Sequence, residues 1–367
     1  MPAATLRDLL GRPLGVLRLS LTARCNLACP YCLPDGQEPP GLLTLPQRRA
    51  VVEAAVALGA TSLRLTGGEP LLNPELEALI AAVQPLRWRG LTGGQPDDAS
   101  GLREVALTSN GQLFSAERAQ RLRAAGLDRI TLSLDGSTGE SVARMAGLAT
   151  PKAGERALEA VLQAIEHAIA AGFDPAAGAL KLNAVIQRGV NDDQLLPLAE
   201  LARQRGIELR LIEVMDVGNR NGWRPEAVLS AAEMVARINE RWGLEPLGRG
   251  PHGTASRWRY RDGCGHLAVV ASISAPFCGD CNRLRVTADG IAYSCLFAAP
   301  ASGLDLRPWL QPTPEPAALR AAIAGLWRQR ADRSSEERGR LEAPATARPA
   351  GAGAERPAHA EMAYLGG

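Results

Sequence analysis

The stretch GVLRLSLTARCNLACPYCLP, residues 15–34, sets a short apolar segment directly before a loop with three cysteines. Alternating aliphatic residues over 15–22 predict a β-strand. Cys25, Cys29 and Cys32 follow it with the spacing C-x3-C-x2-C. In parallel α/β folds the chemistry lies on the loops that follow the strands. The stretch therefore predicts both a fold class and the place of a functional site.

The same order of strand and helix recurs along the first two thirds of the chain. Further strands are expected at 61–68, 104–110, 129–135, 180–186 and 207–215. A helical pattern follows each strand, with possible capping boxes at Thr44 and Gln47 and at Ser230 and Glu233. Six consecutive βα units predict a parallel sheet with right-handed crossovers, arranged as an incomplete (β/α)6 barrel of the TIM type.

The pattern changes beyond about residue 245. Short strands over 256–263, 265–272 and 283–297 predict a small C-terminal antiparallel β module. A surface insertion is expected at 88–101. The segment 331–360 contains one leucine and no other large apolar residue, which predicts a flexible linker. The expected domains are a partial barrel (1–243), a second module (244–330), the linker (331–360) and a tail (361–367).

Composition narrows the classes of function. The net charge is +2, so no global field favours nucleic acid or an anionic membrane as a partner. The N-terminus lacks a secretory apolar region, and no apolar run reaches 18 residues. We therefore expect a cytoplasmic protein, in which clustered cysteines are metal ligands or catalytic groups rather than disulfides.

Two cysteine sets have the spacing of metal sites. Three thiolates can hold three irons of a [4Fe–4S] cluster and leave the fourth iron open for another ligand. For the set at 25–32 the alternative is a zinc site completed by a distant residue. The second set is Cys278, Cys281 and Cys295, and Cys264 lies upstream with the same C-x13-C spacing. A four-cysteine zinc site is therefore an alternative there.

Basic residues in the strands could serve an anionic substrate. Arg18, Arg64 and Lys181 come from the first, second and fifth expected strands and converge on one mouth if they all point inward. Arg283 and Arg285 alternate in NRLRV and so share one face. Arginine forks and lysine are the usual partners of phosphate. The alternative is that each cation faces a helix or pairs with a carboxylate.

The cysteine loop, with Tyr31 before its last cysteine, and TGGEP at 66–70 resemble the radical S-adenosylmethionine (SAM) superfamily. Further segments narrow the resemblance to the MoaA family, the GTP 3′,8-cyclases of molybdenum cofactor biosynthesis. These are LRLSLTARCNLACPYCLPDG, RLTGGEPLL, TSNG, LKLNAVI, LIEVMDVGN, FCGDCNRLRVTADG and the terminal YLGG. The resemblance covers about residues 12–310 and the last residues of the chain.

The resemblance implies two [4Fe–4S] clusters, one on each cysteine set, with SAM on the first and GTP on the second. It implies SAM contacts at Tyr31, Gly67, Gly68, Glu69, Ser133 and Met215. It implies GTP contacts at Arg18, Arg64, Thr108, Lys181, Arg283, Leu284 and Arg285. Roles in catalysis are implied for Arg18, Arg283, Arg285, Gly366 and Gly367, the last two as a tail that enters the active site.

The implied reaction is removal of hydrogen from ribose C3′ of GTP by a 5′-deoxyadenosyl radical. Attack on guanine C8 then gives (8S)-3′,8-cyclo-7,8-dihydroguanosine 5′-triphosphate. The resemblance also implies transfer of this product to cyclic pyranopterin monophosphate synthase and an electron donor that the sequence does not identify. We expect a monomer or a homodimer. The alternatives are a peptide-modifying radical SAM maturase and a non-catalytic zinc protein.

Overall fold

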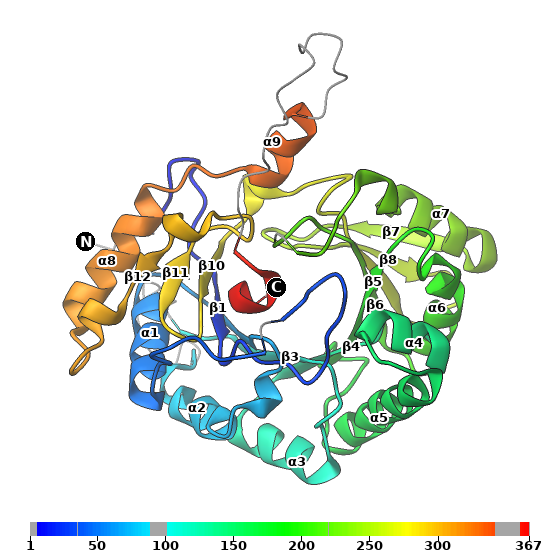
Figure 1. The fold of residues 1–367 in the computed structure, drawn as a ribbon, viewed down its shortest axis with the longest axis horizontal. Helices are drawn as coiled ribbons and strands as arrows, with labels where there is room; N and C mark the ends of the chain where they lie inside the picture. Colours follow the sequence, from blue (N-terminus) through cyan, green and yellow to red (C-terminus); the bar gives the residue numbers. More distant parts are fainter. Residues whose placement is uncertain (1–5, 35, 89–100, 219, 342–359, 367) are drawn as a thin grey trace, which may run out of the picture.

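The computed structural model describes residues 6–34, 36–88, 101–218, 220–341 and 360–366. Most of the expected insertion at 88–101 and the greater part of the expected linker lie outside the described residues. Within them, helices form a ring around a curved sheet, and the C-terminal segment lies inside that ring (Figure 1).

The six predicted βα units are present. Their strands are β1 (Val16–Ser20), β2 (Ser62–Thr66), β3 (Glu104–Ser109), β4 (Arg129–Ser133), β5 (Leu180–Ile186) and β6 (Glu208–Glu213). Consecutive strands pair parallel from β1 to β6. Their buried aliphatic residues form one main core with the surrounding helices. The predicted parallel α/β fold is therefore confirmed.

A helix follows each strand as predicted, and the fourth strand is followed by an additional helix, α4 (Gly139–Ala146), that was not expected. The other helices are α1 (Leu45–Ala57), α2 (Leu76–Ala82), α3 (Ala116–Ala125), α5 (Pro151–Ala170), α6 (Leu195–Gln204) and α7 (Ala231–Trp242). Both predicted capping boxes, at Thr44 and at Ser230, are formed. None of the helices that the structure describes is long and apolar enough to span a membrane.

The C-terminal strands extend the sheet at both of its edges. They are β7 (Leu244–Gly248), β8 (Ser256–Tyr260), β9 (His266–Val270), β10 (Arg283–Val286), β11 (Ile291–Tyr293) and β12 (Leu304–Asp305). They pair antiparallel among themselves, as predicted. However, β10 also pairs parallel with β1, and β9 pairs parallel with β6.

This pairing changes the expected domain picture. In the described part of the chain one sheet of twelve strands runs in the order β12-β11-β10-β1-β2-β3-β4-β5-β6-β9-β8-β7. Strands β7 to β12 therefore share the sheet of the partial barrel, and the expected domain boundary at residue 243 stays a prediction. Consequently the second cysteine set, which flanks β10 and β11, lies beside the first strand of the barrel.

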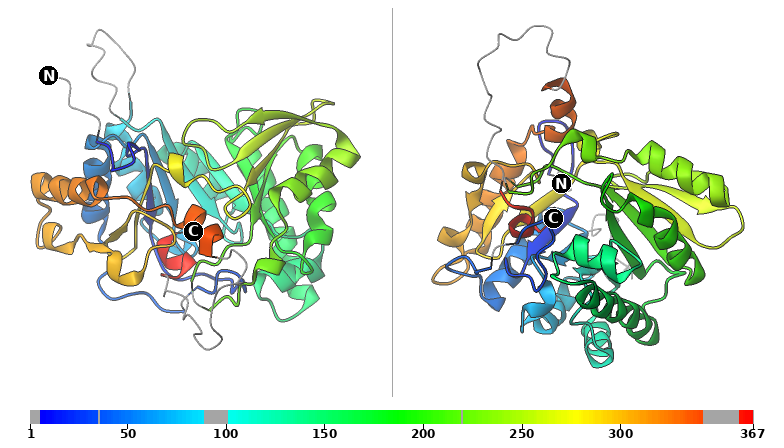
Figure 2. Two further views of the ribbon diagram at one scale, coloured as in Figure 1. Left: turned by 90° about the horizontal axis from the view of Figure 1, so that it is seen from above. Right: turned by 45° about the vertical axis from the view of Figure 1, so that its right-hand side comes forward.

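The last helices reach back to the site. Helix α8 (Pro316–Arg328) packs beside α1, and α9 (Ser334–Leu341) follows it. The structure thus differs from the predicted linker over 331–360, because its first part is helical and Ser335 is buried. The short helix α10 (Met362–Leu365) lies within the ring, as the two views of Figure 2 also show.

Candidate active site

A layer of arginines crosses three neighbouring parallel strands. Arg18 in β1 is in register with Arg64 in β2 on one side and with Arg285 in β10 on the other. Residues in register on adjacent strands share a face of the sheet. All three side chains, with that of Arg283, line a central cavity of about 270 Å³. The predicted convergence of Arg18 and Arg64 on one site is thus observed.

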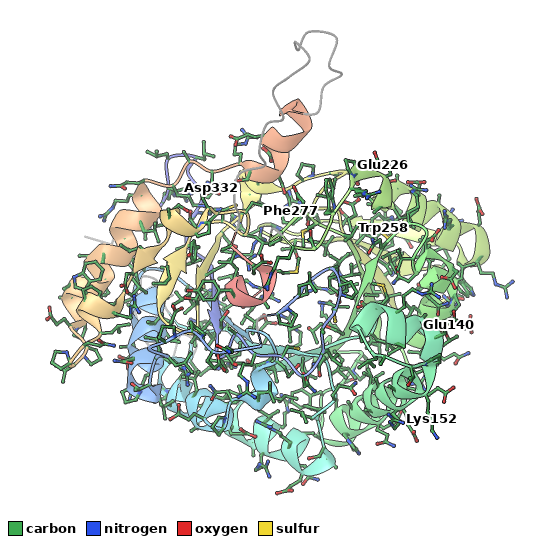
Figure 3. The ribbon with its side chains drawn as sticks, viewed as in Figure 1. Glu140, Lys152, Glu226, Trp258, Phe277 and Asp332 are labelled. Carbon is green, nitrogen blue, oxygen red and sulfur yellow. The ribbon has the colours of Figure 1, made fainter. Side chains whose placement is uncertain are left out.

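The cavity gathers most of the residues expected to meet substrate, and several that were not expected. Thr108 and Met215 line it, as do Cys278, Cys281 and Cys295. The lining residues that sequence reasoning missed include Thr131, Asn183, Arg210, Ile212, Phe277 and Arg330. Phe277 lies near the centre of the ring, whereas Glu140 and Lys152 lie on its outer helices (Figure 3).

The arginine layer is electrostatically poised for an anion. Burial, and then the neighbouring Arg285 and Arg64, lower the pKa of Arg18 well below its ordinary value. Burial and the nearby Arg129 lower the pKa of Arg64 to about 9, and burial and Arg283 lower that of Arg285 to about 10. An anion placed among these cations would relieve their repulsion, because opposite charge favours the protonated form.

Two expected substrate contacts lie elsewhere. Lys181 is not among the lining residues, and its Nζ forms an ion pair of 2.8 Å with the buried Glu208. Leu284 points to the opposite face from its neighbours, into the core against β1, and its side chain is fully buried. Any contact of Leu284 with a ligand would therefore be made by its backbone.

The first cysteine loop is held by the segments that surround it. Its backbone turns tightly, since the amides of Cys32 and Leu33 both donate to the Cys29 carbonyl. Asn110, which follows β3, reaches the Cys25 sulfur at 3.6 Å. Burial raises the pKa of the Cys25 and Cys29 thiols and that of Cys32 to about 12. Three thiols whose burial disfavours the charged form suit a metal group that would hold them as thiolates.

The glycines of TGGEP allow this loop to approach closely. A Cβ on Gly67 would lie 2.4 Å from the Thr22 carbonyl oxygen, and one on Gly68 would lie 2.1 Å from that of Arg24. Gly67 also has a φ of +134°, which favours glycine. The Gly68 amide donates to the Thr22 carbonyl at 2.9 Å. The two glycines therefore lie close to the backbone of residues 22–24, which connect β1 to the first cysteine loop.

Glu69 secures the same loop to the end of β3. Its carboxylate accepts hydrogen bonds from the Ser109 hydroxyl and the Asn110 amide, both at 2.8 Å, and from the Leu71 amide at 3.0 Å. The side chain is almost fully buried, and burial raises its pKa to about 7. Both oxygens are thus engaged within the chain, while the expected SAM contact of Glu69 stays a prediction.

Tyr31 meets a carboxylate that the sequence analysis did not single out. Its hydroxyl donates to Asp135 at 2.6 Å, and Asp135 also accepts from the Val185 amide. Burial raises the pKa of Asp135 to about 6. Asp135 follows β4 two residues after Ser133, so the only available signal was its place at the end of a predicted strand. The expected SAM contacts of Tyr31 and Ser133 stay predictions.

The second cysteine set has three members and no fourth. Cys264 is exposed on the turn between β8 and β9 and is not among the lining residues, unlike Cys278, Cys281 and Cys295. Among the described residues, no three or more His, Cys, Asp or Glu side chains gather as ligands of a single metal ion. An iron–sulfur cluster fits such sets better, because each thiolate binds a different iron.

One apolar cluster touches both cysteine sets. Val217, Phe297 and the tail residue Met362 form it, and Cys32 from the first set and Cys295 from the second pack against it. The expected SAM contact Met215 packs there as well. The two sets therefore lie on the same central site, and the tail is part of the wall between them.

The tail is fixed by polar contacts at several points. The Gly366 carbonyl accepts from Arg18 Nε at 2.9 Å and from Arg285 at 3.2 Å. The Tyr364 hydroxyl lies 2.9 Å from both oxygens of Asp289. Gly366 adopts a φ of +66°, and a Cβ there would lie 2.5 Å from the Thr66 side chain. Gly367, the other expected tail residue, lies outside the described residues.

The fold and the cysteine sets agree with two family models. The Radical SAM superfamily model matches residues 19–202, and the model described as Molybdenum Cofactor Synthesis C matches residues 207–336. The first contains Cys25, Cys29 and Cys32, and the second contains all three members of the other set. These matches define the class as a radical SAM protein with a C-terminal molybdenum cofactor synthesis region.

Curated relatives identify the family within that class. A GTP 3′,8-cyclase of Synechococcus sp. (strain CC9605) is 60% identical over 99% of this chain and 98% of the relative. Those of Acidothermus cellulolyticus and Xanthomonas campestris are each 44% identical over more than nine tenths of this chain. The chain belongs to the GTP 3′,8-cyclase family.

Solved structures support the fold alone. The structure of Streptococcus suis SuiB bound to S-adenosylmethionine aligns with 89% of this chain and 67% of the SuiB chain. The TM-score is 0.57 and the sequence identity is 14%. The SuiB structure with the precursor peptide SuiA gives a TM-score of 0.58. At this identity the likeness concerns architecture, so it does not favour the peptide-modifying alternative over the family that the relatives define.

Proposed function

We propose that this protein is a GTP 3′,8-cyclase. It converts GTP to (8S)-3′,8-cyclo-7,8-dihydroguanosine 5′-triphosphate, the first step of molybdenum cofactor biosynthesis. The proposal rests on one arrangement: an arginine layer (Arg64, Arg18, Arg285) lies in a cavity that is also lined by a three-cysteine set. The names of relatives that match nearly the whole chain support the choice of substrate.

The donor sets fit two [4Fe–4S] clusters, each with one iron left open. Cys25, Cys29 and Cys32 would hold the first beside SAM, and the second set would hold the other beside the base of GTP. When bound and reduced, the first cluster and SAM supply the one-electron chemistry that removes the hydrogen atom from ribose C3′. The chain must then hold both ligands close together and exclude water.

The arginine layer binds the triphosphate in this proposal. GTP carries about four negative charges, and planar guanidinium forks match phosphate oxygens bidentately. In register on β1 and β10 stand Arg18 and Arg285, and Arg283 lines the same cavity. These three cations can therefore contact neighbouring phosphates. Thr108 and Arg64 extend the polar wall toward β3. Loss of one of these cations should weaken GTP binding without removing a cluster ligand.

The tail closes the site and orients these arginines. Gly366 presents its carbonyl to Arg18 and Arg285, which fixes the two guanidiniums relative to each other. Met362 fills the apolar space between the cysteine sets, which excludes water from the place where a radical would form. Deletion of Gly366 and Gly367 should spare the clusters and SAM binding but impair product formation.

Anaerobic incubation with SAM, a reductant and GTP tests the proposal. We expect 5′-deoxyadenosine that depends on GTP, together with the cyclised nucleotide. The reconstituted chain should hold about eight iron atoms. Cys278→Ser should reduce this to about four, whereas the matched variant Cys264→Ser should retain about eight. The proposal would be contradicted if the protein contained zinc and no labile sulfide. It would also be contradicted if 5′-deoxyadenosine formed equally with and without GTP.

A further inference from the structure

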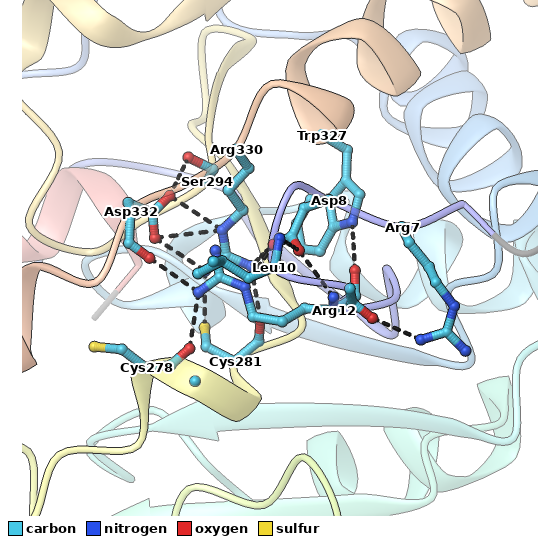
Figure 4. A network of polar contacts seen from close by, with 12 residues as sticks. Arg7, Asp8, Leu10, Arg12, Cys278, Cys281, Ser294, Trp327, Arg330 and Asp332 are labelled. Carbon is cyan, nitrogen blue, oxygen red and sulfur yellow. Dashed lines mark hydrogen bonds and ion pairs between the residues drawn. The ribbon is translucent and has the colours of Figure 1, made fainter.

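A buried polar network lies behind the second cysteine set (Figure 4). Its centre is Arg330, which lies just beyond the end of α8. The side chain of Arg330 is 1% exposed. One Nη of Arg330 donates to the Cys281 carbonyl at 2.7 Å, and the other donates to the Cys281 sulfur at 3.2 Å. One guanidinium therefore holds both the backbone and the thiol of the same expected cluster ligand.

The N-terminal segment joins this network. Arg12 donates to the Cys278 carbonyl at 2.8 Å and to the Asp332 carbonyl at 2.9 Å. Asp8 forms an ion pair with Arg12 and lies 3.8 Å from Arg330. These contacts tie the turn that contains Cys278 and Cys281 to the N-terminal segment and to the residues that follow α8.

Arg330 is itself fixed in orientation. Its guanidinium lies 4.7 Å above the centre of the Trp327 ring, and the Trp327 indole donates to the Arg12 carbonyl at 3.1 Å. Its Nε pairs with Asp332 at 3.0 Å. Packing and ion pairing on several sides leave the fork aimed at Cys281, so the hydrogen bond to sulfur is preorganised.

The charges around the set are arranged asymmetrically. Arg330 and Arg283 both donate to the Cys281 sulfur, at 3.2 and 3.0 Å. Asp332 pairs with Arg330 and also accepts from Ser294, the residue before Cys295. The site thus carries cations at one ligand and a carboxylate near another, and these act on its charge in opposite directions.

We propose that Arg330 is a positioning residue that holds Cys281 and raises the reduction potential of the second cluster, with Asp332 as the opposing charge. This inference rests on the proposed function, which places a cluster there. Reduction adds negative charge to a cluster, and hydrogen bonds and cations at its sulfurs stabilise that charge. Arg283 and Arg330 both line the cavity, and Arg330 in addition holds the Cys281 carbonyl and sulfur, so the role proposed for it is exerted through Cys281.

Redox titration followed by electron paramagnetic resonance tests this inference. A full-length background with Cys25, Cys29 and Cys32 replaced by serine leaves only the second cluster to titrate. Arg330→Gln should lower its potential, with at least a tenfold change in the reduction equilibrium, about 59 mV for one electron. Arg330→Lys should retain part of the effect. The matched control Arg328→Gln, at an exposed position on α8, should leave the potential unchanged.

Asp332→Asn supplies a test of opposite sign. It removes the carboxylate beside the set while Asp8 still faces Arg330, so the potential should rise. If circular dichroism shows that Arg330→Gln does not fold, the sign of the change in reduction potential in Asp332→Asn decides whether the inference holds. Unchanged potentials in folded, iron-loaded variants would overturn the role of Arg330 and leave the proposed function intact. A background protein without any iron would instead overturn the second cluster and the inference with it.

Discussion

Arg18 and Arg285 face each other across the parallel strands β1 and β10, and both donate to the carbonyl oxygen of Gly366. The two cations come from residues 267 positions apart in sequence. The tail carbonyl gives them a common partner. It therefore sets the positions of the two guanidiniums relative to each other.

Replacement of Arg285 by alanine should weaken GTP binding. A hydrogen bond that involves a charged group is worth about 2 kcal/mol, which corresponds to roughly thirtyfold in affinity. Equilibrium binding of GTP to the reconstituted protein without SAM measures this directly. Arg49→Ala is the matched control, since Arg49 is exposed on α1 and pairs only with Glu53 among the contacts described. Equal affinity of the Arg285→Ala protein and the wild type would contradict the role.

Gly366→Ala should displace the tail. Its backbone is left-handed, and the added Cβ would lie 2.5 Å from the Thr66 side chain and 2.8 Å from the Ser20 hydroxyl. The left-handed backbone alone costs about 1–2 kcal/mol, so cyclisation should slow by roughly tenfold or more. The rate of product formation at unchanged iron content measures the effect. Gly325→Ala, in α8 with open space at its Cβ, should keep wild-type activity.

Sequence periodicity predicted the parallel strands of the partial barrel but not the strands that extend the sheet at both edges. The six βα units repeat a local pattern, so each strand could be assigned from its own residues and the helix after it. The strands at 266–270 and 283–286 are equally clear locally, yet their partners β6 and β1 lie far away in sequence. Nothing in a short alternating strand specifies which edge it joins, so a separate module was the simpler expectation.

The site residues divide in the same way into those that a local motif reveals and those that it does not. Cysteine spacing and TGGEP are local motifs, and the two cysteine sets that the spacing singled out lie on one central site. Arg210 lines the same cavity but lies in none of these motifs, because a lone polar residue in a strand has the same pattern whether it faces a ligand or a helix. Arg330 stands at a helix end, where an arginine ordinarily indicates favourable interaction with the helix dipole.

Tyr364→Phe should loosen the tail without touching the cavity. The hydroxyl lies 2.9 Å from both oxygens of the buried Asp289, and loss of a bond to a carboxylate costs about 2 kcal/mol. We expect slower cyclisation with unchanged iron content and GTP affinity. Tyr260→Phe is a matched control, because the buried Tyr260 hydroxyl has no hydrogen-bond partner within the described part of the chain. A Tyr364→Phe enzyme as fast as the control would show that this contact does not hold the tail.

Glu69 should make the metal-free protein less stable as pH rises toward neutrality. Burial raises its pKa in the folded chain to about 7, above the ordinary 4.5 of the unfolded chain. Between these values the folded state binds more protons, so its contribution is fully present below about 4.5 and is lost as pH rises through about 7. A shift of this size corresponds to roughly 3 kcal/mol.

Glu69→Gln should remove this dependence. The difference in urea midpoint between variant and wild type, measured from about pH 4.5 to 7.5, should move in favour of the variant as pH rises. Taking the difference cancels the contributions of groups that the two proteins share, Asp135 among them. Glu226→Gln, at an exposed position, should show no such trend (Figure 3). A constant difference across the window would mean that Glu69 is ionised throughout, held by its three donors at Ser109, Asn110 and Leu71.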